Sequence, residues 1–154
     1  MLSQEILTLK RISVGDPAAS KKRILEHAAQ LLAADDGKPG VETIFDRLLE
    51  RERLGSTGLS GGVALPHARM PGLDRTVGAF MRLEQAVDFD ASDGQAVDLV
   101  FALLVPEQAT QEHLDLLARL ARLFSDPQTR ARLRSADAAS TLQLLTEATA
   151  HDAA

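Results

Sequence analysis

The stretch Val97-Asp98-Leu99-Val100-Phe101-Ala102-Leu103-Leu104-Val105-Pro106 is apolar at nearly every position, with Asp98 as its one charged residue. A strand with one solvated face alternates apolar and polar residues, whereas a strand that is apolar throughout is buried on both faces. Pro106 has no backbone N–H to donate and ends the run. This stretch therefore predicts a strand that is buried on both faces of its sheet.

Strands and helices are expected around this stretch. Further strand candidates are Arg11 to Val14, Val63-Ala64-Leu65, which ends at Pro66-His67, and Thr76 to Leu83. Helices are expected from Asp16-Pro17 to Asp35-Asp36-Gly37, after Gly40 up to Glu50-Arg51-Glu52-Arg53, from Thr110 as a cap to about Phe124, from Asp126-Pro127, and over residues 136–150. The order predicts an α/β fold in which helices on both faces sandwich a mixed β-sheet.

Length and composition exclude several classes of protein. The 154 residues suit one domain, expected at 1–150, with a short tail at 151–154. A formal charge of −5 and an aromatic content of 3% argue against nucleic acid as a partner. The chain has no cysteine and no apolar run long enough to span a membrane, and its N-terminus does not read as a signal peptide. A cytoplasmic protein without membrane insertion is expected.

Chemistry concentrates in the segment from Gly55 to Arg69, which holds four of the ten glycines and one of the four histidines. Its glycines suggest a phosphate loop, but the lysine of a nucleotide-binding P-loop is missing and the loop follows a helix. Gly58-Leu59-Ser60-Gly61-Gly62 matches the pattern of a serine-hydrolase elbow, but that elbow joins a strand to a helix. His67 and His113 lie 46 positions apart, so a metal site is weakly supported, and no metal or cofactor is expected.

A histidine that accepts a phosphoryl group fits this segment better. A neutral imidazole has one ring nitrogen with a free lone pair for in-line attack. The transferred group then needs positive charge and hydrogen-bond donors around its oxygens. Arg51, the hydroxyls of Ser56 and Thr57, and the N–H groups of the loop can supply them. Ser56 and Thr57 could equally serve only to satisfy a turn, and His113 alone would be ordinary in the first turn of a helix.

Several motifs together resemble one family. They are Arg51-Glu52-Arg53-Leu54-Gly55-Ser56-Thr57-Gly58, Val63-Ala64-Leu65-Pro66-His67, Ser20-Lys21-Lys22-Arg23, the stretch from Val97 to Pro106, and Thr110-Gln111-Glu112-His113-Leu114. The chain is similar over nearly its whole length to the type-2 enzyme IIA domain of the bacterial phosphotransferase system. That is the fructose/mannitol class, and the nitrogen-regulatory branch is the nearest match.

The resemblance implies a phosphotransferase component with a phosphohistidine intermediate, which does not act as a catalyst alone. His67 would take a phosphoryl group from an HPr-like phosphocarrier, and His113 and Arg51 would complete the catalytic site. Ser56, Thr57 and Gly58 would bind phosphate, and no cofactor is implied. The phosphorylation state would regulate partner proteins such as transporters or kinases.

Two other functions stay open on the sequence. One is a sugar-specific enzyme IIA that passes phosphate to an enzyme IIB, and the other is a non-catalytic interaction module on the same fold. The chain also departs from the family pattern at Ser60, Gly61 and Ala68, where Gly-Asn and a glycine after the histidine are usual. These changes are expected to tune transfer or partner fit, and not to remove the nucleophile.

Overall fold

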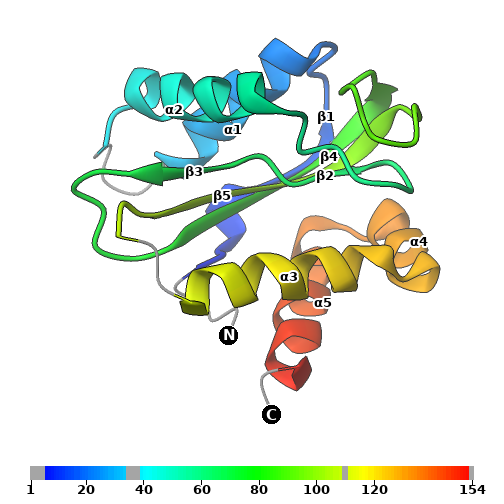
Figure 1. Cartoon of the computed structure of the whole chain (residues 1–154). Helices are drawn as coiled ribbons and strands as arrows, with labels where there is room; N and C mark the ends of the chain where they lie inside the picture. The colour runs from blue at the N-terminus through cyan, green and yellow to red at the C-terminus, as the bar shows by residue number, and fades with distance from the viewer. Residues whose placement is uncertain (1–5, 34–38, 109–110, 153–154) are drawn as a thin grey trace.

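The computed structural model describes residues 6–33, 39–108 and 111–152. A mixed five-stranded sheet lies between two layers of helices, with α1 and α2 on one face and α3, α4 and α5 on the other (Figure 1). The elements in chain order are the 3₁₀ turn η1 (Leu9–Arg11), β1 (Ile12–Asp16), α1 (Lys21–Leu32), α2 (Val41–Leu54), β2 (Val63–Ala64), β3 (His67–Met70), β4 (Val77–Val87), β5 (Val97–Pro106), α3 (Gln111–Ser125), α4 (Pro127–Ser135) and α5 (Ala138–Asp152). The predicted α/β sandwich is confirmed.

The apolar strand β5 is buried along nearly its whole length, as its sequence predicted, and it lies inside the sheet. β4 pairs with it antiparallel on one side, and β1 follows β4 in parallel. On the other side β5 pairs in parallel with β2 and then, further along, with β3. β2 and β3 therefore form one edge of the sheet. They follow each other in the sequence and pair with successive parts of β5.

Alternate residues of β5 enter two separate cores. Ala102 and Leu104 pack with the buried faces of α1 and α2. Phe101 and Leu103 pack with α3, α4 and α5, where the Phe80 and Phe124 rings stack with centroids 6.4 Å apart. This alternation follows from the two-residue period of a strand. It decides which helices a side chain at the sheet edge can meet.

The helix start predicted at Asp16-Pro17 is wrong. Asp16 ends β1 and is buried, and its carboxylate accepts hydrogen bonds from the Ser13 hydroxyl and the Ala18 N–H. Ser20 caps α1 instead, because its hydroxyl oxygen accepts from the N–H of Arg23 at 3.1 Å. A tertiary role for the carboxylate thus outweighed a local capping signal. The predicted helix end at 35–37 and the cap at Thr110 lie outside the described residues.

The strand predicted to finish at Pro66-His67 instead resumes there. Pro66 lacks an N–H, so the ladder is interrupted at this residue, although its carbonyl accepts from the N–H of Leu103 at 2.9 Å. His67 then begins β3, opposite Leu103. The proline break therefore fixes the residue at which the second half of the edge strand starts.

Candidate phosphoryl-transfer site

The strand register orients His67 toward α3. Paired residues on neighbouring strands point to the same face of a sheet, and Leu103, the partner of His67, lies in the core beneath α3. His67 is half-buried and lines a cavity of about 340 Å³ together with His113. The edge position of β3 lets residues of α2 reach the same cavity from the other face.

The imidazole of His67 is held as one tautomer. Its Nδ1 lies 2.7 Å from the carbonyl oxygen of Leu65. A carbonyl only accepts hydrogen bonds, so Nδ1 carries the proton and Nε2 keeps a free lone pair. Nε2 is therefore the nucleophilic atom of this ring.

The surroundings of His67 favour its neutral form. Burial has the largest influence and lowers the pKa of His67 below its ordinary value. The hydrogen bond to Leu65 raises this pKa, the positive charge of Arg51 lowers it, and the negative charge of Glu52 raises it, with a lowered pKa as the net result. The ring is thus a neutral nucleophile at neutral pH.

Arg51 brings positive charge to the cavity from the last turn of α2. Its Nη1 donates to the Gly55 carbonyl at 3.0 Å, which holds the side chain across the helix end. This is a hydrogen bond to an exposed carbonyl, and a guanidinium has further donors for an incoming anion. Arg53, two residues later, is exposed and does not line this cavity.

Residues from two sides surround His67. We call Arg47, Glu50, Arg51, Leu54, His67, Ala68 and Arg69 the α2–β3 rim, and His113, Leu114 and Leu117 the α3 rim. Val105 of β5 completes the cavity lining between them. The structure therefore brings together His67, His113 and Arg51, the three residues predicted to be catalytic.

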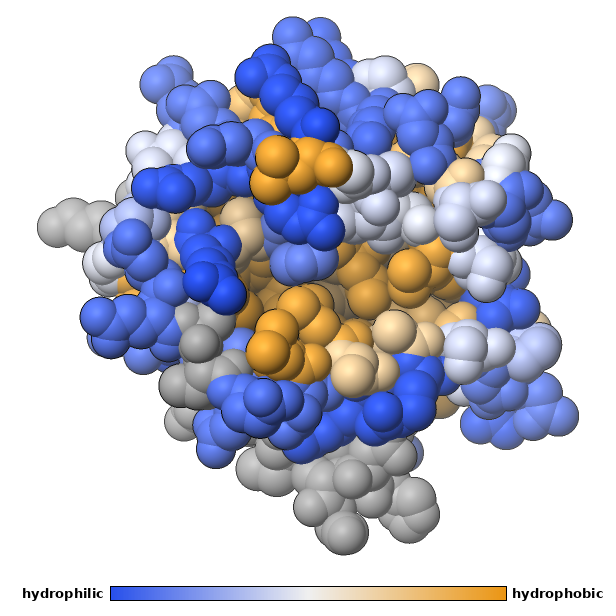
Figure 2. All heavy atoms as spheres, viewed as in Figure 1, coloured by the Kyte–Doolittle hydropathy of each residue, from blue (hydrophilic) through white to orange (hydrophobic). Residues whose placement is uncertain are grey.

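Both rims expose apolar side chains. Leu54 is 83% exposed at the end of α2, and Leu114 is 52% exposed at the start of α3. Figure 2 shows hydrophobic residues gathered over the space between α2 and α3, with hydrophilic residues around them. Such a patch, rimmed by polar groups, is typical of a surface that binds another protein.

Ser56, Thr57 and Gly58 lie outside this cavity lining. The hydroxyl of Ser56 donates to the Phe89 carbonyl and accepts from the Gly58 N–H, at 2.7 and 3.0 Å. Thr57 is buried, and both its N–H and its hydroxyl donate to the Glu52 carboxylate at 2.7 Å. Gly58 packs against Ala91, where a Cβ would come within 2.8 Å of the Ala91 Cα. These contacts are those of a turn that satisfies its own polar groups.

Two of the departures from the family pattern, Gly61 and Ala68, have a local explanation. Gly61 and Gly62 both adopt positive φ, +79° and +82°, in the turn that brings the chain back to β2. The turn is closed by the N–H of Leu59, which donates to the Val63 carbonyl at 2.7 Å. Ala68 pairs with Leu104 in extended β3, so this position needs no positive φ. Its replacement of the usual glycine is compatible with the strand.

Glu52 is a further residue near the site, and no motif of the sequence predicts it there. It lies next to Arg51, its side chain is 2% exposed, and its charge acts on the pKa of His67. The available signal was an acidic residue in the last turn of a helix, where the helix dipole disfavours negative charge. Only the tertiary structure shows that the loop and α1 supply its partners.

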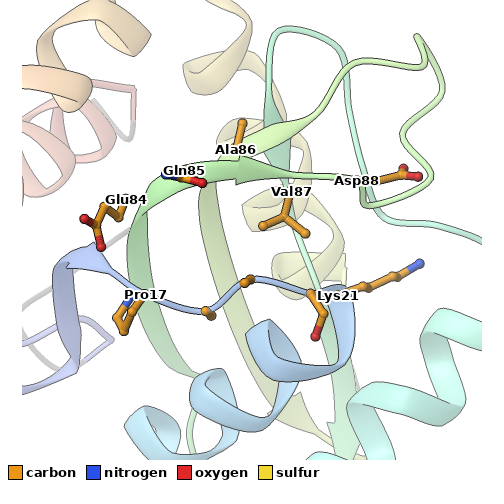
Figure 3. Close-up of a pocket in the computed structure, with 10 residues that line it drawn as sticks. Pro17, Lys21, Glu84, Gln85, Ala86, Val87 and Asp88 are labelled. Carbon is orange, nitrogen blue, oxygen red and sulfur yellow. The ribbon is translucent and has the colours of Figure 1, made fainter.

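Other features of the structure lie apart from this site. His27 of α1 contacts the buried Asp16 carboxylate through Nδ1. A second cavity, of about 490 Å³, lies between the start of α1 and the end of β4, and Figure 3 shows Pro17, Glu84 and Asp88 along it. Within the described ranges no three acidic or histidine side chains cluster as a metal site would require. In the same residues no helix has both the length and the apolar character needed to cross a membrane.

Comparisons of the sequence identify relatives along most of the chain. The family model for the phosphoenolpyruvate-dependent sugar phosphotransferase system, EIIA 2, matches residues 5–148. A nitrogen regulatory protein of Pseudomonas aeruginosa is 48% identical over 139 residues, which cover 90% of each chain. A fructose-specific EIIA component of Haloferax volcanii is 34% identical over 139 residues, again 90% of each chain.

Comparisons of the structure agree with this result. The crystal structure of nitrogen regulatory protein IIA-Ntr from Neisseria meningitidis matches with a TM-score of 0.88 and 43% identity, over 95% of this chain and all of that one. IIA mannitol from Escherichia coli matches with a TM-score of 0.74 at 23% identity, over 90% and 98% of the two chains. The second match shows a shared fold.

Proposed function

Since the chain belongs to the EIIA 2 family of the phosphoenolpyruvate-dependent sugar phosphotransferase system, we propose that it is a nitrogen-regulatory enzyme IIA. His67 accepts a phosphoryl group from an HPr-like phosphocarrier, and the phosphorylation state of the chain regulates partner proteins such as transporters or kinases. The protein acts as one domain in the cytoplasm and carries the phosphoryl group as a phosphohistidine, so it does not turn over a substrate alone.

The observation that supports this proposal most is the arrangement of the three polar residues in the cavity. Nδ1 of His67 is bound to the Leu65 carbonyl, so the free lone pair is on Nε2. Arg51 and His113 line the same cavity from α2 and α3. Phosphoryl transfer needs a positioned nucleophile with positive charge and donors around the moving oxygens, and little other chemistry.

Phosphoryl transfer from the carrier to His67 needs no further reactant. The lone pair of Nε2 forms a bond to phosphorus while the nitrogen–phosphorus bond of the carrier's phosphohistidine breaks, and that electron pair returns to the carrier's nitrogen. Nδ1 of His67 keeps its proton, and the ring gains positive charge as the phosphoryl group arrives. The Leu65 carbonyl faces this charge at 2.7 Å from Nδ1. Arg51 and His113 stabilise the phosphoryl oxygens.

The two apolar rims fit a protein as the donor. Leu54 and Leu114 are exposed on opposite sides of His67 and would pack against an apolar surface around the carrier's phosphohistidine. Arg47 and Arg69 add positive charge on the α2–β3 rim. In this proposal Ser56, Thr57 and Gly58 hold the loop in shape, and the phosphoryl group contacts Arg51 and His113.

A reconstituted phosphorylation assay tests the proposal. The protein is incubated with enzyme I, an HPr-type carrier and phosphoenolpyruvate, and its intact mass is measured before and after acid treatment. We expect an acid-labile phosphoryl group on the wild type and none on His67→Ala, with His27→Ala labelled like the wild type. An unlabelled wild type would favour a non-catalytic interaction module, and equal label on His67→Ala would exclude His67 as the acceptor.

A sugar-specific enzyme IIA is the second candidate, because a relative at 34% identity is a fructose-specific component. The two functions differ in their partners and share the chemistry of His67. Comparing a nitrogen-type carrier with a sugar-type HPr as donor, under equal concentrations, separates them. Faster uptake from the nitrogen-type carrier, and no transfer onward to an enzyme IIB, supports the nitrogen-regulatory function.

A further inference from the structure

Glu52 occupies a position that is unfavourable for a carboxylate in two ways. It lies in the last turn of α2, where the negative end of the helix dipole opposes an anion. It is also buried, and a buried charge destabilises a fold unless it is paired and hydrogen-bonded. A carboxylate in such a place needs compensating contacts, and the structure provides them.

The partners of Glu52 come from two other segments. The N–H and hydroxyl of Thr57 donate to its two carboxylate oxygens, both at 2.7 Å. The Nζ of Lys21, from the first turn of α1, lies 3.2 Å from Oε1 and 4.7 Å from the centroid of the Phe89 ring. In Figure 3 the Lys21 side chain extends away from Glu84 and Gln85. Glu52 thus joins α1, the end of α2 and the loop that leads to His67.

We propose that Glu52 is a positioning residue of the phosphoryl-transfer site, which fixes the loop before His67 and stabilises positive charge on the imidazole ring during transfer. The inference rests on the proposed function and extends it to a residue that does not line the cavity. Lys21 partly neutralises the carboxylate and so limits its effect on the ring.

The electrostatic part follows from the neighbours of His67. The charged and titratable residues that share its cavity are Arg47, Glu50, Arg51, Arg69 and His113. Of the two charges that act on the pKa of His67, Arg51 lowers it and Glu52 raises it. Raising the pKa means favouring the charged ring, and the ring acquires this charge when Nε2 bonds to phosphorus. In this proposal Arg51 stabilises the phosphoryl oxygens, while Glu52 stabilises the positive charge on the imidazole ring.

The test uses Glu52→Gln, which keeps the shape of the side chain and removes its charge. We expect the pKa of His67, measured by NMR titration of the imidazole, to fall below its wild-type value. Phosphoryl uptake from the HPr-type carrier should slow by about five- to tenfold, the effect of one screened charge near the ring. Glu42→Gln, an exposed carboxylate in the first turn of the same helix, should match the wild type in both measurements.

Two further variants separate charge from loop structure. Lys21→Met removes the cation that compensates Glu52 and should shift the pKa of His67 upward, opposite to Glu52→Gln. Thr57→Val removes one hydrogen bond to the carboxylate but keeps its charge, so it should lower the melting temperature and leave the pKa of His67 in place. If Glu52→Gln does not fold, the upward shift in Lys21→Met still tests the charge.

The outcomes are distinct. Unchanged His67 titration and uptake in a folded Glu52→Gln would overturn the inference, and so would identical pKa shifts in Glu52→Gln and Thr57→Val, which would reduce Glu52 to a loop contact. A wild type that takes up no phosphate would remove the proposed function, whereas the titrations would still decide whether Glu52 favours the charged ring.

Discussion

The two rims of the cavity are built differently. The α2–β3 rim carries His67 and is supported by hydrogen bonds: the buried Glu52 carboxylate accepts from Thr57, and the Leu65 carbonyl holds the half-buried ring of His67. The α3 rim is the first two turns of one helix, where Leu114 is exposed and His113 and Leu117 are half-buried. The buried residues of α3 are Leu116, Leu120 and Phe124, which pack in the core beneath the helix.

This difference separates the groups that hold His67 in place from the exposed groups that a partner can cover. In-line transfer requires the nucleophile to be held within a fraction of an ångström, and buried hydrogen bonds provide that. Recognition of several partners requires exposed apolar and polar groups that different surfaces can cover. Changes in the polar groups around His67 should therefore alter the rate of transfer, and changes in the exposed apolar groups of either rim should alter partner binding.

The largest effect is expected for Arg51→Gln. Loss of the guanidinium removes positive charge and donors from the phosphoryl oxygens and should slow transfer by about a hundredfold. The measurement is a single-turnover uptake rate from the phosphorylated carrier. Arg53→Gln, exposed in the same helix turn, should change the rate by less than about twofold. Equal losses in both variants would indicate general charge attraction and not a contact in the site.

The pH dependence of Arg51→Gln adds a second readout. The neutral ring is the nucleophile, so uptake persists down to the lowered pKa of His67 and is lost as pH falls through it. Because Arg51 lowers that pKa, its removal should move the midpoint of the pH profile upward. A midpoint that does not move would contradict the proximity of the two groups.

Gly62→Ala tests how much the turn before β2 contributes to stability. Gly62 has φ of +82°, and an added Cβ would lie 2.7 Å from Nη2 of Arg134, which binds Asp98. Strain and loss of this contact should lower the free energy of unfolding by about 2–3 kcal/mol. Gly72→Ala has a similar φ of +79° with nothing near the new Cβ, so it should lose only about 1–2 kcal/mol. Urea unfolding measures both, and equal losses would mean that Arg134 adds nothing.

The sequence predicted the parts of the fold that depend on local patterns. The apolar run of β5 predicted a covered strand, and Asp126 before Pro127 predicted the start of α4, which the Asp126 carboxylate caps. The local signal at Asp16-Pro17 failed because the carboxylate is bound by residues of β1 and by His27, a tertiary contact. The break at Pro66 is a local effect, but the renewed pairing of His67 with Leu103 depends on the neighbouring strand.

The sequence also predicted only some of the residues in and around the candidate site. His67, His113 and Arg51 were identified by motifs, and the structure places them in one cavity. The contacts of Glu52 could not be predicted, because one partner, Lys21, lies 31 positions earlier and because a charged residue does not reveal its burial in the sequence. Ser56 and Thr57 were ambiguous, since a hydroxyl beside glycines suits a phosphate and a turn equally well.

On the α3 rim, His113→Ala should have a smaller effect than Arg51→Gln. One hydrogen bond to the phosphoryl group is lost, which corresponds to about a tenfold slower uptake. Glu112→Gln, an exposed neighbour in the same helix turn, serves as the matched control and should leave the rate within about twofold. If His113→Ala slows uptake as much as Arg51→Gln does, the α3 rim contributes to the transfer step as much as the α2–β3 rim.

The smallest effect is expected for Leu54→Ser. Leu54 is 83% exposed, so its replacement should leave the melting temperature unchanged. It would remove apolar contact with the carrier, and the loss of about 1 kcal/mol should raise KM for the phosphorylated carrier about fivefold without changing kcat. Leu9→Ser is the control, because Leu9 is 52% exposed on η1 and does not line the cavity. A fall in kcat with constant KM would instead place Leu54 in the transfer step. Exposed groups would then affect the rate as well as partner binding, contrary to the comparison above.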